Sequence, residues 1–181
     1  INEDEFDLSY YTYGMSIYKN MPLIEPLETK EVKKIYEFVI ALDTSYSIDE
    51  NLAKRFISNT YSILSTSNMF YKSCKVYIIQ CDDRIRKENV ISNQNEMNRL
   101  LDSFTLIGGG NTDFRPVFSY VNDLVNQHVF QNLCGLLYFT DGKGVYPKKC
   151  PAYKTAFIYL EDYDQSKVPS WAIQYRLEEK I

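Results

Sequence analysis

The sequence predicts an α/β fold in which a three-layer, doubly wound and mostly parallel sheet has helices on both faces. Nearly continuous apolar runs at 36–42, 75–81, 133–139 and 155–160 are typical of strands that are buried on both faces. Helical patterns alternate with these runs, and this alternation favours a parallel sheet. Short oxygen-rich segments follow two of the runs directly, where open parallel sheets bind their ligands.

The remaining elements have weaker signals. Ser47 and Glu50 fit a capping box, which predicts that a helix begins at Ser47. A short helix is expected at 95–101, and a further helix has Pro116 in its first turn, where proline is favoured. Residues 87–91 are expected to form a short edge strand. The alternating pattern at 171–177 predicts a last strand that is half exposed.

Residues 1–34 show no clear periodicity and mix aromatic residues with prolines. The apolar segment at 21–27 is interrupted by two prolines, so we expect an extended arm there and not a helix. We therefore divide the chain into an irregular N-terminal arm or linker at 1–34 and one domain at 35–181. Since the chain starts with Ile1 and has no signal-peptide pattern, we expect it to be part of a longer protein.

Composition excludes several classes of function. The formal net charge is -4 and no block of basic residues occurs, which argues against nucleic acid as a partner. No apolar run is long enough to span a bilayer, so we expect no membrane partner. We expect a cytoplasmic location, in line with free thiols in a reducing compartment. The four cysteines form no C-x-x-C pair and are expected to be free thiols. A zinc site is disfavoured because the cysteine spacing is wrong and His128 is the single histidine. His128 ends a helical pattern and is expected to cap it.

Three oxygen-rich segments are the candidate site. Asp43, Ser45 and Ser47 follow the first buried strand, Thr112 follows a run of three glycines, and Asp141 follows the third buried strand. The set offers two carboxylates and three hydroxyls without sulfur or imidazole, which suits a hard dication such as Mg²⁺.

Each segment also has an ordinary structural explanation. Ser47 alone could be a helix N-cap, and the glycine run could be a flexible turn. That run lacks the Lys-Ser/Thr pair of a phosphate-binding loop, and a Thr-Asp-Gly turn is common at strand ends. We expect the neighbouring acids Asp82 and Asp83 to form a solvated strand end rather than a metal site.

Residues 43–47 resemble the D-x-S-x-S motif of von Willebrand factor type A (VWA) domains, with Thr112 and Asp141 matching the family's second and third motifs. The likeness spans about 34–177. The string at 108–118 resembles a narrower branch, the bacterial VWA-like domains that follow a predicted metallopeptidase domain.

The resemblance implies a Rossmann-like fold with a metal-ion-dependent adhesion site (MIDAS). Ser45 and Ser47 would bind Mg²⁺ or Mn²⁺ directly, Thr112 directly or through water, and Asp43 and Asp141 largely through water. A carboxylate from a protein partner would complete the octahedron. The resemblance further implies a bacterial protein-binding module, not an enzyme, with a MoxR-type AAA+ ATPase as a candidate partner.

Two positions depart from the family pattern. Tyr46 replaces the usual glycine between the serines, and the C-terminus has a strand pattern in place of the long closing helix. The alternative function is a Mg²⁺-dependent phosphohydrolase that uses the same acidic strand ends, with Arg115 as the nearest phosphate-binding candidate. It is disfavoured because Ser45 stands where haloacid-dehalogenase-like phosphatases need a second aspartate. An inert scaffold with a vestigial site is the third alternative.

Overall fold

The computed structural model describes residues 6–7, 25–26, 36–45, 48–66, 74–160 and 162–177. The chain divides into two compact units, Ile1–Lys33 and Lys34–Ile181. In the first unit, strands β1 (Phe6–Asp7) and β2 (Glu25–Pro26) pair antiparallel. Most of the predicted extended arm lies outside the described residues.

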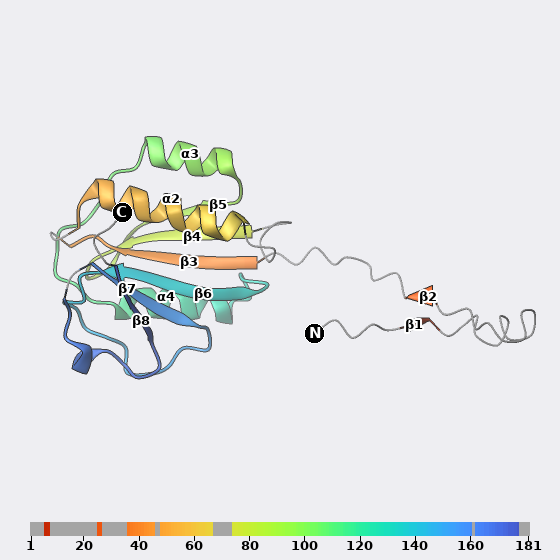
Figure 1. The fold of residues 1–181 in the computed structure, drawn as a ribbon. Helices are drawn as coiled ribbons and strands as arrows, with labels where there is room; N and C mark the ends of the chain where they lie inside the picture. The colour runs from red at the N-terminus through yellow and green to blue at the C-terminus, as the bar shows by residue number, and fades with distance from the viewer. Residues whose placement is uncertain are drawn as a thin grey trace, which may run out of the picture. The chain divides into compact units, whose positions relative to one another are not determined.

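The second unit contains a six-stranded sheet with the order β5-β4-β3-β6-β7-β8 (Figure 1). The strands are β3 (Tyr36–Asp43), β4 (Cys74–Cys81), β5 (Ile85–Ile91), β6 (Leu133–Thr140), β7 (Thr155–Tyr159) and β8 (Ile173–Arg176). Every neighbouring pair is parallel except β4 and β5, which are antiparallel. This arrangement confirms the predicted, mostly parallel α/β sheet.

Strand β3 lies between β4 and β6 and is buried on both faces. Val39 and Ala41 contribute to one hydrophobic cluster, whereas Ile40 and Leu42 contribute to the other, because successive side chains of a strand point to opposite faces. A strand in this position needs apolar residues throughout, which explains the continuous run in the sequence.

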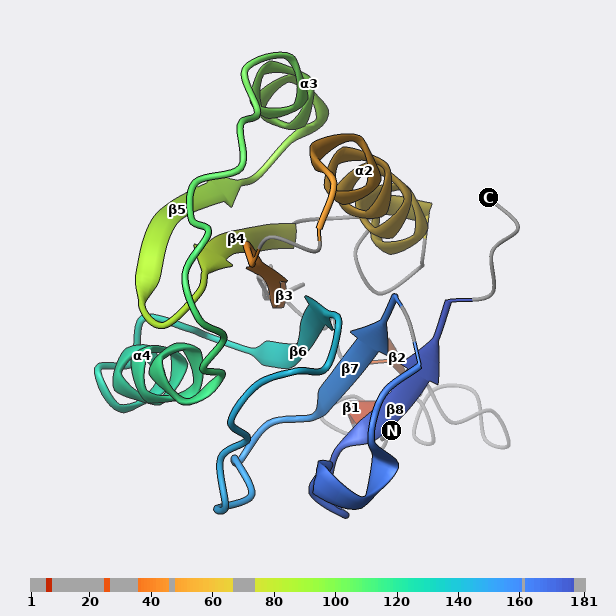
Figure 2. The same ribbon diagram turned by 90° about the vertical axis from the view of Figure 1, so that its left-hand side faces the viewer.

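Among the described residues, three α-helices cover the two faces of the sheet. Helices α2 (Glu50–Thr66) and α3 (Gln94–Asp102) pack on one face of the sheet, and α4 (Arg115–Asn126) packs on the other (Figure 2). The predicted three-layer architecture is therefore confirmed. None of the helices in the described ranges has the length and apolar character needed to cross a membrane.

Helix α2 begins later than the capping box predicts. Its first residue is Glu50, and the Asp49 carboxylate accepts hydrogen bonds from the backbone N–H groups of Asn51 and Leu52. Asp49 is thus the N-cap, and the predicted start at Ser47 is wrong. The chain turns first, since the Ile48 N–H donates to the Ser45 carbonyl at 3.2 Å.

The last residue of helix α4 is Asn126, and His128 lies in the turn that caps the helix, as predicted. His128 has a left-handed backbone with φ 56°, and its N–H donates to the Val125 carbonyl at 3.0 Å. The Val129 N–H donates to the Leu124 carbonyl, so both bonds satisfy carbonyls of the last helical turn. Pro116 stands in the first turn, also as predicted.

The sheet ends in two different edge strands. The antiparallel edge β5 confirms the predicted edge strand and begins two residues earlier, at Ile85. Strand β8 follows the short 3₁₀ helix η1 (Gln165–Lys167), and all four of its residues are exposed, with Ile173 at 59% and Tyr175 at 58%. The prediction of a half-exposed strand was therefore wrong for β8, because its alternating side chains are exposed on both faces at this edge.

Candidate metal centre

Asp43 is the last residue of β3 and is completely buried. One carboxylate oxygen, Oδ1, accepts a hydrogen bond from the Ser45 backbone N–H at 3.0 Å and lies 3.5 Å from Thr112 Oγ1. The other, Oδ2, accepts from the Thr140 hydroxyl at 2.7 Å. The carboxylate therefore connects three segments that are far apart in the sequence, as parallel strands that end at one edge of a sheet allow.

Asp43 has no cationic partner among the described residues. Burial raises its pKa, hydrogen bonds from Thr140 and Ser45 oppose this effect, and the negative charge of Asp141 raises the pKa further. A buried carboxylate that is satisfied only by neutral donors and lies near a second carboxylate is an unfavourable arrangement without a positive charge. A divalent cation would relieve it, so the side chains present fit the predicted ion.

Asp141 directly follows β6 and is also buried, with 4% of its surface exposed. Its Oδ1 accepts the Lys143 backbone N–H at 2.9 Å, and its Oδ2 lies 3.5 Å from Lys143 Nζ. Gly142 has φ 84°, which is a conformation that favours glycine, and its N–H donates to the Thr140 hydroxyl at 3.0 Å. The Thr-Asp-Gly sequence therefore forms a tight turn that presents Asp141 at the carboxyl edge.

Thr112 approaches Asp43 from the loop between α3 and α4. This loop passes close to β3, because a Cβ on Gly108 would lie 1.9 Å from Thr44 Oγ1. Any side chain at position 108 would therefore collide with Thr44, whose own hydroxyl donates to the Cys81 carbonyl at 3.1 Å. The glycine run is thus a close-packing requirement and more than a flexible turn.

The structure brings together some of the predicted ligands. Asp43, Thr112 and the backbone of Ser45 are in direct proximity, and Asp141 is close enough for its charge to act on Asp43. Ser47 and the neighbouring Tyr46 lie outside the described residues. In the ranges that the structure describes, no group of three or more His, Cys, Asp and Glu side chains could hold a metal ion. The predicted ligand set does not form such a group, because it has only two carboxylates and its other donors are hydroxyls.

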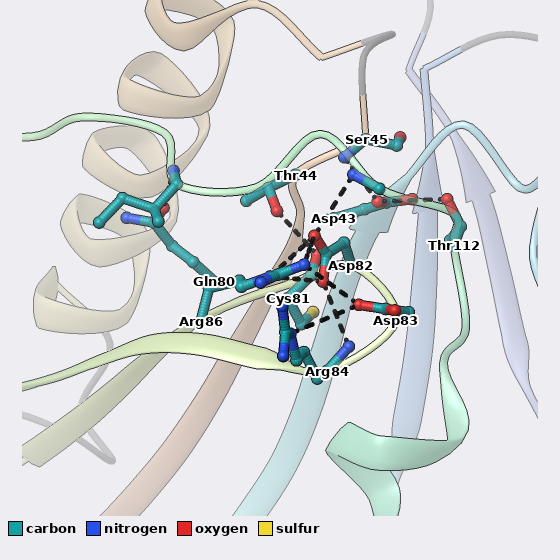
Figure 3. A network of polar contacts seen from close by, with 12 residues as sticks. Asp43, Thr44, Ser45, Gln80, Cys81, Asp82, Asp83, Arg84, Arg86 and Thr112 are labelled. Carbon is teal, nitrogen blue, oxygen red and sulfur yellow. Dashed lines mark hydrogen bonds and ion pairs between the residues drawn. The ribbon is translucent and has the colours of Figure 1, made fainter.

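Sequence reasoning missed a polar network behind the site, shown in Figure 3. Asp82 was expected to be solvated, but its exposed fraction is 0% and its carboxylate forms a bidentate ion pair with Arg86 at 2.7 to 2.8 Å. Asp83 is exposed, as expected for a strand end. Burial alone would raise the pKa of Asp82, but hydrogen bonds from Arg86 and from the Arg84 backbone outweigh it and lower the pKa to about 2.

Gln80 is the second missed residue. It is 1% exposed, and its side-chain amide bonds the loop that contains Thr112 at both Thr105 and Ile107. The available signal was a glutamine within an otherwise apolar strand. A buried amide needs hydrogen-bond partners, so it indicated a fixed segment beside β4.

The profile of the family described as VWA-like domain (DUF2201) matches residues 38–178. Among curated proteins, none matches this sequence. Solved structures with a similar fold include the ArnB paralog VWA2 from Sulfolobus acidocaldarius, which is 16% identical with a TM-score of 0.52. That match covers 85% of this chain and 44% of the VWA2 chain, so it spans less than half of that protein.

Two further structures are similar over nearly their whole length. The conserved hypothetical protein BatB from Bacteroides thetaiotaomicron is 14% identical with a TM-score of 0.51, over 80% of this chain and 91% of BatB. The SpRpn10 VWA domain is 11% identical with a TM-score of 0.50, and the match covers 78% of this chain and 87% of that domain. At these low identities, the similarity shows a shared fold only.

The family match covers most of the chain and coincides with the six-stranded sheet and the candidate metal centre. The VWA-like fold supports a role in protein interaction in general terms. This chain belongs to the DUF2201 family of VWA-like domains.

Proposed function

We propose that this domain is a metal-ion-dependent protein-binding module. Mg²⁺ or Mn²⁺ would be held by Asp43, Ser45, Ser47, Thr112 and Asp141, and a carboxylate of the partner protein would complete its coordination. The observation that supports this most is Asp43, a completely buried carboxylate with neutral donors only among the described residues. A dication supplies the positive charge that this position lacks.

The chemistry of the donors favours a hard cation. Asp43 and Asp141 supply carboxylate oxygens, and Thr112 supplies a hydroxyl 3.5 Å from Asp43 Oδ1. The two carboxylates would just balance the charge of a dication and would act on it largely through water, so its direct protein ligands would be neutral hydroxyls. Such an ion would keep affinity for one further anionic oxygen ligand. An aspartate or glutamate side chain of a partner has the charge and the oxygen donors for this position.

One observation favours binding over the alternative of phosphate-ester hydrolysis. Arg115, the nearest candidate for stabilising a phosphoryl group, is paired with Asp113 by hydrogen bonds of 2.6 to 3.1 Å. Lys143 is paired with Asp141. Phosphoryl transfer depends on cationic groups directed at the transferred group. We therefore propose a binding role for this domain and no catalytic one.

The wider setting follows from the family resemblance alone. We propose that the domain works in the cytoplasm as part of a larger bacterial protein with a metallopeptidase domain upstream. A MoxR-type AAA+ ATPase is the proposed partner, and the acidic residue that completes the metal shell would lie on its surface.

Calorimetric titration with Mn²⁺ tests the metal site. The wild-type chain should bind one ion, and Asp43→Ala should abolish binding because it removes the central carboxylate. Asp43→Asn keeps the shape and a hydrogen-bond acceptor for Thr140, so it separates loss of charge from loss of fold. Asp123→Asn removes an exposed carboxylate on α4 and should bind like wild type. A wild-type isotherm for both Asp43 variants would contradict the assignment.

Affinity capture with the immobilised domain tests the partner. The AAA+ ATPase should be retained in Mg²⁺ and lost in EDTA, and Asp43→Asn should retain none in either buffer. Equal capture in Mg²⁺ and EDTA would show that the interaction does not depend on a metal ion.

A further inference from the structure

The loop at 103–114 has few apolar anchors of its own. Phe104 and Phe114 are buried at its two ends, but most of the residues between them are exposed or half-buried. It also contains three glycines, and Gly109 has φ 115°. Such a segment has high conformational freedom and must be held by contacts from elsewhere to keep Thr112 in place.

Strand β4 supplies the first of these contacts. The Gln80 side chain donates from Nε2 to the Thr105 carbonyl at 3.1 Å and accepts at Oε1 from the Ile107 N–H at 2.8 Å. Both functional groups of one buried amide therefore bond the backbone of the same loop.

Asp82, at the turn between β4 and β5, supplies the second. Its Oδ2 lies 3.4 Å from the Gly110 N–H, and its backbone carbonyl accepts from the Asp113 N–H at 3.1 Å. These contacts lie on both sides of Thr112. Figure 3 shows the Asp82 carboxylate between Arg86 and the loop.

Arg86 makes this arrangement stable. Its guanidinium contacts both carboxylate oxygens of Asp82, which is itself completely buried. A buried carboxylate without a cation would be costly, so the ion pair keeps Asp82 charged beside the loop. A bidentate pair also fixes the orientation of the carboxylate, because both partners are planar.

We infer that Gln80, Asp82 and Arg86 are positioning residues that hold the 103–114 loop so that the Thr112 hydroxyl meets Asp43. We call these three residues the loop clamp. None of them contacts Asp43 or Thr112 through a side chain in the described structure, so they act through the loop backbone. The effect on metal affinity rests on the proposed function, whereas the effect on loop order does not.

Two variants test the loop clamp by different means. Asp82→Asn removes the charge that pairs with Arg86. Gly110→Ala keeps both charges of the ion pair but adds a Cβ 3.2 Å from Asp82 Oδ2, a crowded contact that the loop or the carboxylate must relieve by a small shift. Arg84→Ala is the matched control, since its side chain is 70% exposed and only its backbone contacts Asp82.

Amide hydrogen exchange of the metal-free protein is the first measurement. Exchange at Gly110 and Asp113 should become about tenfold faster in both test variants, because the loop opens more often. Amides of β3 and α4 should keep wild-type rates, and Arg84→Ala should match wild type throughout. A merely structural role would instead accelerate exchange across the whole domain. Wild-type rates at Gly110 and Asp113 in both variants would overturn the inference.

Mn²⁺ affinity is the second measurement. Substitutions behind a metal site typically weaken binding by about 10- to 100-fold, and we expect about tenfold for Asp82→Asn. A looser loop with unchanged Mn²⁺ affinity would overturn the role of the loop clamp at the site. If the wild-type chain binds no Mn²⁺, the proposed function fails, while the exchange rates still decide whether the loop clamp exists.

Discussion

Asp82 and Asp43, two of the buried carboxylates at this sheet edge, are compensated in different ways. Asp82 has the guanidinium of Arg86 against both of its oxygens, and its pKa is lowered. Asp43 has hydroxyl and amide donors, and burial raises its pKa. The difference explains why Asp43, and not the pair Asp82–Asp83, is the candidate for holding an added cation.

Cys81 is another residue whose behaviour follows from burial. It ends β4 with 1% of its surface exposed, and its Sγ donates to the Leu42 carbonyl at 3.3 Å. It lies 3.0 Å from the Tyr138 hydroxyl. Burial raises the pKa of its thiol far above the ordinary range, so the reactive thiolate is nearly absent at neutral pH.

The four cysteines should therefore differ in reactivity toward Ellman's reagent at pH 8. Cys150 is exposed and should react first, whereas Cys81 should react only after unfolding. Cys74 and Cys134 are half-buried and should react slowly, because burial raises the pKa of both thiols, that of Cys74 to about 12. Cys81→Ala should leave the number of rapidly reacting thiols unchanged. If the folded wild type shows a second rapidly reacting thiol and Cys81→Ala lacks it, Cys81 is accessible and the prediction is wrong.

At the scale of elements, the start of α2 is determined by the loop that precedes it. Ser47 and Asp49 are both good N-cap residues, and the capping-box pattern favoured Ser47. The turn from Ser45 to Ile48 must be completed before the helix begins, so Asp49 takes the position. Local sequence preference could not decide between two caps two residues apart.

Asp49→Ala should lower the free energy of unfolding by about 1 kcal/mol, because two backbone N–H groups of α2 lose their acceptor. Asp49→Asn keeps the acceptor and should cost only a few tenths of that. Urea unfolding followed by circular dichroism measures both. Equal loss in the two variants would indicate that the charge of Asp49, and not the cap, stabilises the helix.

The strands were the most predictable elements. Residues 36–42, 75–81 and 133–139 were assigned as buried strands because their apolar runs match a sheet covered on both faces, and β3, β4 and β6 occupy these positions. β8 was less predictable in its burial. Alternation of apolar and polar side chains at 171–177 indicated a strand, but exposure depends on whether another layer covers the edge.

At the scale of the whole molecule, an aromatic cluster joins α4 to β6 and β7. Phe157 is completely buried and stacks with Tyr138 at a ring-centroid distance of 5.4 Å. It also contacts Phe114 at 5.5 Å and Tyr146 at 5.1 Å. Phe114 is the last residue of the loop that contains Thr112, so packing of this layer also supports the candidate site.

Phe157→Ala should therefore lower the free energy of unfolding by about 3 to 5 kcal/mol, because it leaves a cavity among rings that cannot fully close. Fluorescence of Trp171, the single tryptophan, reports unfolding of this layer, since its ring meets Phe118 edge to face at 5.9 Å. Ile173→Ala, at a side chain that is 59% exposed, is the control and should change stability by about 0.5 kcal/mol or less. Similar losses in both variants would show that the cluster does not dominate the core.

The sequence by itself determined the α/β class, the buried strands and the family motifs around Asp43, Thr112 and Asp141, because hydrophobic periodicity and short motifs are local properties. Only the tertiary structure decided that Asp49 caps α2, that Gln80 bonds the 103–114 loop, and that Asp82 is buried against Arg86. The physical reason is that burial and pairing of a polar side chain depend on residues brought near it by the sheet. The sequence alone does not show which distant side chain will neutralise a buried charge.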